Sequence, residues 1–272
     1  MKMQNEECKI QNDLRQSWRW IVCFALLAVG LVACDQKQSS KTMNKEEIKA
    51  KIMEKDAAPS AEALARKENS IAILKQREVP FVQHLPVIED SKSAKRRTKE
   101  EIAHRAIALC LVAVKGEGLE HEKIQDLVKR YDAQAFFTPA ERKFIENPSP
   151  TQQERVQFSW RYEGLWTLLW ALGYADSLDY PDKVCDVPKA VGFLRGKKTD
   201  EFVASAKLRD LSAILDEADL IYRYDWAVVN ARLKKQNAPA SLDGGVVVER
   251  HHALNWLIGY MNQEWDDVTT DT

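Results

Sequence analysis

Two Glu-x-x-His motifs, Glu101–His104 and Glu249–His252, contain residue types that bind metal ions. Residues three apart lie on adjacent turns of a helix, so each motif directs a carboxylate and an imidazole to the same face. Di-iron carboxylate bundles use two such pairs together with a glutamate from each of two further helices. Here Glu163 and Asp216 or Asp219 would be the additional ligands. The two pairs stand first and last, however, whereas in the ferritin-like order a glutamate precedes each pair.

A second group of charges lies within Leu215–Trp226, where Asp216, Asp219 and Arg223 follow helical spacing and share one face. Two carboxylates on one face could bind a metal or divide the roles of general acid and general base. The alternative is a structural network of ion pairs, because Arg223 supplies the opposite charge on the same face.

Charges also occur at the start of the most apolar segment, Trp160–Gly173, whose composition predicts a buried helix. A buried charge is costly unless it is paired. An enzyme would gather the acids of the C-terminal half in one cleft, whereas a structural role would pair each acid with an arginine. The candidate residues for this cleft, or for these ion pairs, are Arg161, Glu163, Asp216, Asp219, Arg223, Glu249, Arg250, His252, Asp266 and Asp267.

The overall charge and the motif content exclude several function classes. Lysine and arginine total 40 against 41 aspartate and glutamate, so no global field attracts nucleic acid. The basic run Lys92–Lys99 has no interleaved aromatic residue and is typical of a solvated helix entry. The chain contains no GxSxG, Walker, HExxH or CxxC motif. We predict no nucleic-acid partner, and the sequence indicates no cofactor.

The N-terminus has the features of an export signal. Residues 21–33 form an apolar run of 13 after Arg15 and Arg19, too short for a comfortable membrane span. The run ends in Leu31–Cys34, which resembles the lipobox of bacterial lipoproteins, where the cysteine is acylated and the signal is cut before it. Asp35 resembles the signal for retention in the inner membrane, facing the periplasm. The alternative is a signal anchor with an incidental cysteine.

The rest of the chain reads as a tether followed by one helical domain. Glycine and proline are scarce, at 10 and 9 residues, and no sustained alternation of apolar and polar residues predicts a strand. We therefore predict an all-α fold, with a signal peptide over 1–33, a flexible tether over 34–59 and a multi-helix domain over 60–272. Helices are expected over 60–76, 98–116, 120–131, 138–147, 151–172, 188–195, from 199, over 211–235 and over 247–263, with a turn at 244–245.

Two cysteines remain after the signal and the acylated position are set aside, Cys110 and Cys185. An oxidising compartment would permit a disulfide between them. Cys110 lies inside an apolar helical run, which favours a buried free thiol instead.

Several stretches together resemble the domain of unknown function 4272 family. They are W-R-Y-E-G-L-W-T-L-L-W-A-L-G from Trp160, L-D-E-A-D-L-I-Y-R-Y-D-W-A from Leu215 and V-E-R-H-H-A-L-N-W-L from Val248, with W-D-D-V-T-T-D-T from Trp265. The earlier L-P-V-I-E from Leu85 and R-T-K-E-E-I-A-H-R-A from Arg97 also fit. The resemblance covers residues 66–272. It implies a mainly helical domain with no assigned activity, so no catalytic residue carries over.

We expect a membrane-tethered lipoprotein whose domain binds a protein of the cell envelope, as a scaffold or an immunity-type module. Its partners would be the membrane, through the lipid on Cys34, and an envelope protein. The six tryptophans of the C-terminal half are candidate interface anchors or core residues: Trp160, Trp166, Trp170, Trp226, Trp256 and Trp265. One alternative is a metal- or carboxylate-dependent enzyme that uses the acids above. Another is a small-molecule or lipid-binding envelope protein, which needs a large apolar pocket.

Overall fold

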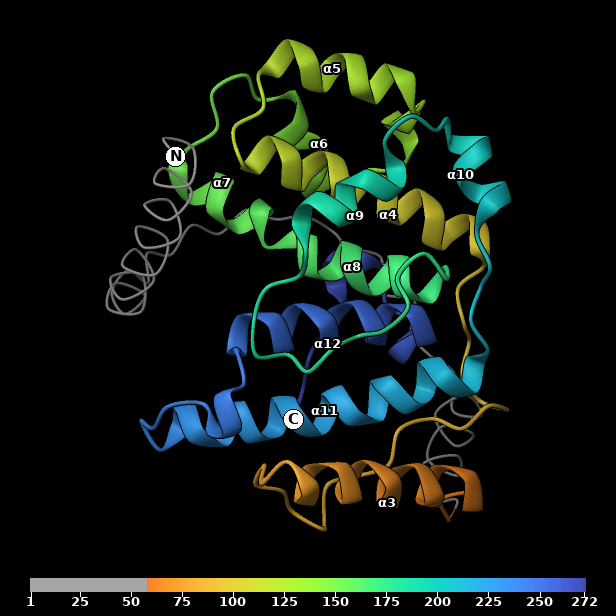
Figure 1. Ribbon diagram of the computed structural model, residues 1–272, viewed down its shortest axis with the longest axis vertical. Helices are drawn as coiled ribbons and strands as arrows, with labels where there is room; N and C mark the ends of the chain where they lie inside the picture. The colour runs from red at the N-terminus through yellow and green to blue at the C-terminus, as the bar shows by residue number, and fades with distance from the viewer. Residues whose placement is uncertain (1–57) are drawn as a thin grey trace, which may run out of the picture. The chain divides into compact units, whose positions relative to one another are not determined.

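Helix α4 (Lys99–Gly116) lies at the centre of the fold in the computed structural model, which describes residues 58–272 (Figure 1). Its residues from Ile102 to Ala113 are apolar on almost every face, so neighbouring helices cover it on all sides. The Thr98 hydroxyl accepts a hydrogen bond from the Glu101 N–H, and the Glu101 carboxylate accepts one from the Thr98 N–H. This is the capping box that the sequence predicts.

The remaining elements agree in type and order with the helices predicted from the sequence. They are α3 (Ala61–Gln76), α5 (His121–Arg130), α6 (Pro139–Glu146), α7 (Gln152–Ser159), α8 (Arg161–Ala171), α9 (Val187–Leu194), α10 (Thr199–Ser205), α11 (Leu211–Leu233) and α12 (Gly244–Ile258), with short 3₁₀ turns η1 (Ala133–Ala135), η2 (Pro239–Ser241), η3 (Tyr260–Asn262) and η4 (Trp265–Asp267). No strand occurs within residues 58–272. The all-α prediction is confirmed for this part of the chain.

The long helices pack side by side in an order that differs from their order in the sequence. Helix α3 packs on α11, α11 on α12, α12 on α8 and α8 on α4, while α5, α6, α7 and α10 cover other sides of α4 (Figure 1). The elements that carry the predicted site residues, α8, α11 and α12, are therefore consecutive neighbours in this stack.

The single helix predicted over 151–172 is wrong, because the chain divides at Trp160 into α7 and α8. Helix α7 packs closely on α4: a Cβ added to Gly116 would lie 2.7 Å from the Arg155 carbonyl oxygen. The Trp160 ring packs on α12 instead, where a Cβ on Gly245 would lie 2.6 Å from it. The bend lets the chain make both contacts. It also explains why Gly245 lies in the first turn of α12 and not in the predicted turn.

The predicted extension of α12 to residue 263 is also wrong, since the helix ends at Ile258 with Gly259 in the left-handed conformation, at φ 69°. The backbone of the basic segment runs beside this end, and its N–H groups at Lys95 and Arg97 donate to the carbonyls of Ile258 and Leu257. A Cβ on Gly259 would lie 2.5 Å from the Lys95 carbonyl oxygen, so this close approach requires glycine.

The predicted signal peptide, the acylation site Cys34, Asp35 and nearly all of the tether fall on residues 1–57, outside the described residues. Of the helices between residues 58 and 272, none has the length and apolarity to cross a membrane. Cys110 and Cys185 are free thiols. Burial raises the pKa of Cys110 to about 12, as expected for a thiol in an apolar helix.

Candidate functional site

Helices α8 and α12 are joined by two ion pairs that we call the crossed pairs, because each helix supplies one arginine and one glutamate. Arg161 Nη1 of α8 donates to both carboxylate oxygens of Glu249, at 3.0 and 2.9 Å. In the other direction, Arg250 Nε of α12 donates to Glu163 Oε2 at 3.3 Å. The crossed pairs thus bring together four of the residues that the sequence offered for a cleft.

The Glu163–Arg250 pair is the more buried of the two, with side chains 2% and 5% exposed. The Cys185 N–H also donates to Glu163, and Arg250 Nη1 donates to the Asp179 carbonyl oxygen at 2.6 Å. Burial raises the pKa of Glu163, while the Arg250 charge and the hydrogen bonds from Cys185 act in the opposite direction. This glutamate is therefore held in the interior by an arginine and a backbone N–H.

The Arg161–Glu249 pair is partly open to solvent, with side chains 21% and 14% exposed. Burial raises the pKa of Glu249, and the neighbouring Arg161 opposes that shift. His252 lies one turn further along α12. Burial, together with the charge of Arg161, lowers the pKa of His252 to about 4, so its imidazole is neutral at pH 7.

The C-terminal Trp265 inserts beside these groups into what we call the Trp265 pocket, formed by Arg105, Gly164, His252 and Trp256. The indole makes edge contacts with the rings of His252 and Trp256, at centroid distances of 4.6 and 5.4 Å. The Arg105 guanidinium lies over it at 5.2 Å. A Cβ on Gly164 would lie 3.5 Å from the Trp265 ring, at ordinary van der Waals contact, so the indole packs directly against this turn of α8.

Arg105 of α4 and Glu141 of α6 form a further buried ion pair at this pocket, with side chains 6% and 2% exposed. Burial lowers the pKa of Arg105, and the charges of Glu141 and the nearby Asp266 counteract it. Reasoning from the sequence missed both residues. A usable signal existed, because Arg105 is a charge in the middle of an apolar helical run and such a charge needs a buried partner.

Unpartnered polar atoms concentrate around Trp265. Nine buried side-chain nitrogen or oxygen atoms of the described residues have no hydrogen-bond partner. Six of them belong to the crossed pairs, to the Arg105–Glu141 pair or to the Trp265 pocket: Arg105 Nε, Glu141 Oε1, Arg161 Nε, His252 Nδ1, Trp256 Nε1 and Trp265 Nε1. Because buried polar groups are normally paired, this concentration of unpaired atoms marks the region as unusual within the described residues.

The two predicted acids of α11, Asp216 and Asp219, lie away from the crossed pairs. Asp219 accepts two hydrogen bonds from Arg223, at 2.7 and 2.8 Å, and Arg223 also donates to the Pro86 carbonyl oxygen. Asp216 instead pairs with Arg66 of α3 at 2.9 Å, a partner that the sequence did not indicate. Asp266 and Asp267 are exposed in η4.

The two Glu-x-x-His motifs have different environments. Glu101 closes the capping box at the start of α4, and the His104 ring stacks on Phe136 with centroids 4.0 Å apart. Glu249 pairs with Arg161, as described above. Across residues 58–272, no three histidine, cysteine, aspartate or glutamate side chains are grouped so as to hold a metal ion.

Comparison with known proteins gives one match. A family model described as Domain of unknown function (DUF4272) matches residues 66–268, which include every residue of the crossed pairs and of the Trp265 pocket. Neither a curated protein nor a solved structure matches the chain.

Proposed function

The chain belongs to the domain of unknown function 4272 family, and we propose that it is a membrane-tethered bacterial lipoprotein whose helical domain binds another protein of the cell envelope. The tether is supported by the sequence Leu31–Cys34 at the end of the apolar run. Acylation at several positions gives durable anchoring, at about 0.8 kcal/mol for each buried CH₂ group. Asp35 supports retention at the inner membrane, facing the periplasm.

The observation that carries the binding role is the pairing of the candidate catalytic acids with arginines. Glu163, Glu249 and Asp219 each accept hydrogen bonds from an arginine of α8, α11 or α12, and Asp216 pairs with Arg66. Each of these carboxylates has its oxygens engaged by a fixed guanidinium, which leaves less of the group accessible to a substrate. This pairing argues against the alternative of a carboxylate-dependent enzyme and favours a domain that acts through its surface and its Trp265 pocket.

The tether is tested by metabolic labelling with an alkyne fatty acid in a bacterial host, followed by membrane fractionation. We expect the wild-type chain to be labelled and to fractionate with membranes, and Cys34→Ala to lose the label. Cys23→Ala is the matched control, because it removes a cysteine from the apolar run without touching the lipobox. Equal labelling of Cys34→Ala and wild type, or no labelling of wild type, contradicts the tether.

The binding role is tested by crosslinking tagged full-length chain in membranes before solubilisation. We expect a discrete crosslinked species that an unrelated tagged lipoprotein of the same membrane does not give. A crosslinking pattern identical to that of the unrelated lipoprotein contradicts the binding role.

A further inference from the structure

The C-terminal tail, residues 263–272, has one buried side chain. Among residues 259–272, all of which the structure describes, Trp265 alone is buried, at 3% exposure, and Glu264, Asp266 and Asp267 around it are exposed. The other attachments are the partly buried Val268, which packs against the core, and an ion pair between Arg97 and Glu264 at 3.6 Å. Hydrogen bonds also run from Asn255 Nδ2 to the Thr269 carbonyl oxygen at 2.9 Å and from Arg97 Nη2 to that of Gln263 at 2.7 Å. One buried aromatic anchor with polar neighbours is how short segments dock in pockets.

The pocket is suited to an indole. Gly164 packs against the ring, Arg105 lies over it, and His252 and Trp256 present their rings to it in near-perpendicular arrangements, at 76° and 74°. A guanidinium over an indole face and edge-to-face aromatic pairs are both attractive arrangements. The contacts with Arg105, His252 and Trp256 therefore favour a tryptophan over other apolar side chains at this position.

The tail fills this pocket without satisfying its polar groups. Arg105 Nε and Glu141 Oε1 lie beside the tail, are buried and have no hydrogen-bond partner. Arg105 and Glu141 are more than nine-tenths buried. A segment whose polar side chains paired with these atoms would bind more favourably than the tail does, because unpaired buried polar groups are costly. The tail is thus an occupant that a better-matched segment can displace.

The chain between α12 and the tail has the geometry of a hinge. Gly259 has φ 69°, and Met261 and Asn262 have φ values of 52° and 54°. The left-handed region is unfavourable for residues other than glycine and asparagine, so Met261 carries backbone strain in this segment. Met261 is also 67% exposed, which leaves this segment free to rearrange.

We propose that the Trp265 pocket is the site at which this domain binds a partner protein, through a segment with a tryptophan flanked by acidic residues. In this account the C-terminal tail is an intramolecular occupant that the partner displaces. The inference rests on the proposed binding role, since it names the class of partner and the regulation of that role. The acidic flanks follow from the occupant itself, whose tryptophan lies between Glu264 and Asp266.

The test uses a fluorescent peptide with the sequence of residues 263–272, QEWDDVTTDT, and the full-length chain in detergent. Trp265→Ala removes the intramolecular anchor, so the peptide should bind this variant at least about tenfold more tightly than wild type, in which the tail competes. The matched control peptide carries alanine in place of tryptophan and should not bind. Adding Gly164→Leu to Trp265→Ala fills the pocket and should abolish peptide binding.

The proposal is overturned if Trp265→Ala unfolds cooperatively, as wild type does, yet does not bind the peptide, or if it binds the control peptide equally well. If that variant does not fold, the wild-type chain provides the decisive measurement. The indole N–H of Trp265 should exchange with solvent through local opening, faster than the amides in the middle of α12. Exchange as slow as that of those amides overturns the proposal.

The peptide assay and the labelling of Cys34 fail independently. If the chain is not labelled but the peptide still binds, the proposed membrane tether is wrong and the proposed binding site is supported. If the chain is labelled and crosslinks to a partner but does not bind the peptide, the proposed function is supported. The Trp265 pocket is then not the site of binding.

Discussion

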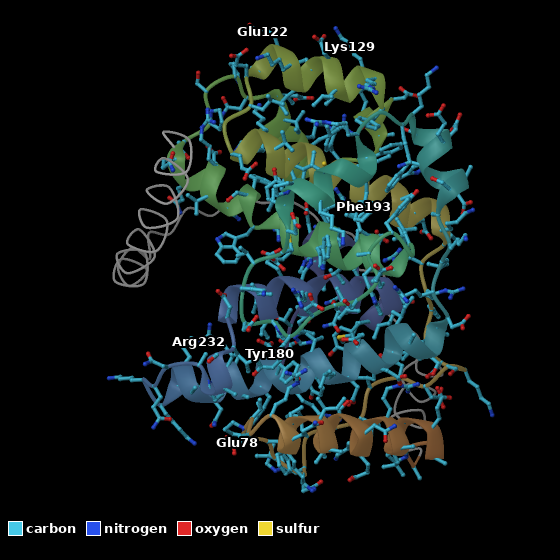
Figure 2. The ribbon with its side chains drawn as sticks, viewed as in Figure 1. Glu78, Glu122, Lys129, Tyr180, Phe193 and Arg232 are labelled. Carbon is cyan, nitrogen blue, oxygen red and sulfur yellow. The ribbon has the colours of Figure 1, made fainter. Side chains whose placement is uncertain are left out.

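The buried charges of α11 and the crossed pairs of α8 and α12 neutralise arginines and carboxylates in different ways. Asp219 and Arg223 lie one turn apart on a single helix and make two hydrogen bonds. The crossed pairs join residues 88 and 87 positions apart in the sequence (Figure 2 shows the side chains around these helices). The first pair can form as soon as α11 forms, whereas the crossed pairs exist only after two helices dock. The Asp219–Arg223 pair therefore reports on an interaction within one helix, and the crossed pairs report on interactions between two helices.

The largest effect is expected at the local pair. Asp219→Ala leaves Arg223 buried at 1% exposure without its carboxylate. We expect the free energy of unfolding to fall by about 3–5 kcal/mol, measured by urea denaturation, because an uncompensated buried charge is strongly destabilising. The double variant Asp219→Leu with Arg223→Met removes both charges and should recover most of the loss. A loss below about 1 kcal/mol in the single variant would contradict this role.

The buried crossed pair should be the next most sensitive. Arg250→Met removes the guanidinium and leaves the Glu163 carboxylate, which is 2% exposed, buried without its partner. A loss of roughly 2–3 kcal/mol in the same denaturation experiment is therefore expected. Arg232→Met, at an exposed position of α11, is the control and should change stability by less than about 0.5 kcal/mol. Equal effects of the two variants would show that the Arg250 charge is not needed.

Glu217 lies on α11, and the charge of Arg250 on α12 acts on its pKa. Burial raises its pKa to about 7, from an ordinary value of 4.5. Between these two values the folded chain holds more protons than the unfolded chain, so this group lowers stability as pH rises from about 5 to about 8. Glu217→Gln, which stays neutral, should match wild type near pH 5 and be more stable by roughly 1–2 kcal/mol near pH 8.

Denaturation curves at the two pH values measure that difference. Comparing the variant with wild type isolates Glu217 from His252, whose lowered pKa acts on stability in the opposite direction. A variant that parallels wild type at both pH values would rule out the raised pKa.

The smallest effect is expected at the partly exposed crossed pair. Glu249→Gln should cost about 1 kcal/mol or less, because solvent screens the Arg161–Glu249 attraction. A double-mutant cycle with Arg161→Met, repeated at high salt, measures the coupling between the two residues. If the Arg161–Glu249 coupling energy is as large as the stability loss expected for Asp219→Ala, then the pair between helices stabilises the fold as much as the pair within α11. That result would contradict the expected order of effects.

Local features of the fold were predictable from the sequence. The capping boxes at Thr98, Thr138 and Thr151 have the expected hydrogen bonds, and the all-α class is confirmed. The errors occur where distant segments meet. The division of the helix at Trp160 depends on Gly245, and the end of α12 at Ile258 depends on the backbone of Lys95. No pattern within a single segment contains that information.

The candidate site shows the same division. The sequence supplied Arg161, Glu163, Glu249 and Arg250 as residues that needed explanation, but not which acid pairs with which arginine. It missed Arg105 and Glu141, because a capping glutamate at Thr138 gave no sign that the same carboxylate also holds a buried arginine of another helix.

The sequence by itself determined the class of fold, the family and the helix starts that have capping boxes, because these depend on residue types within a few turns of one another. It also predicted an export signal, on which the proposed location rests. Tertiary structure decided the partners of the charges and the position of Trp265. Those contacts depend on how α4, α8 and α12 dock, and docking is set by packing between residues that are far apart in the chain.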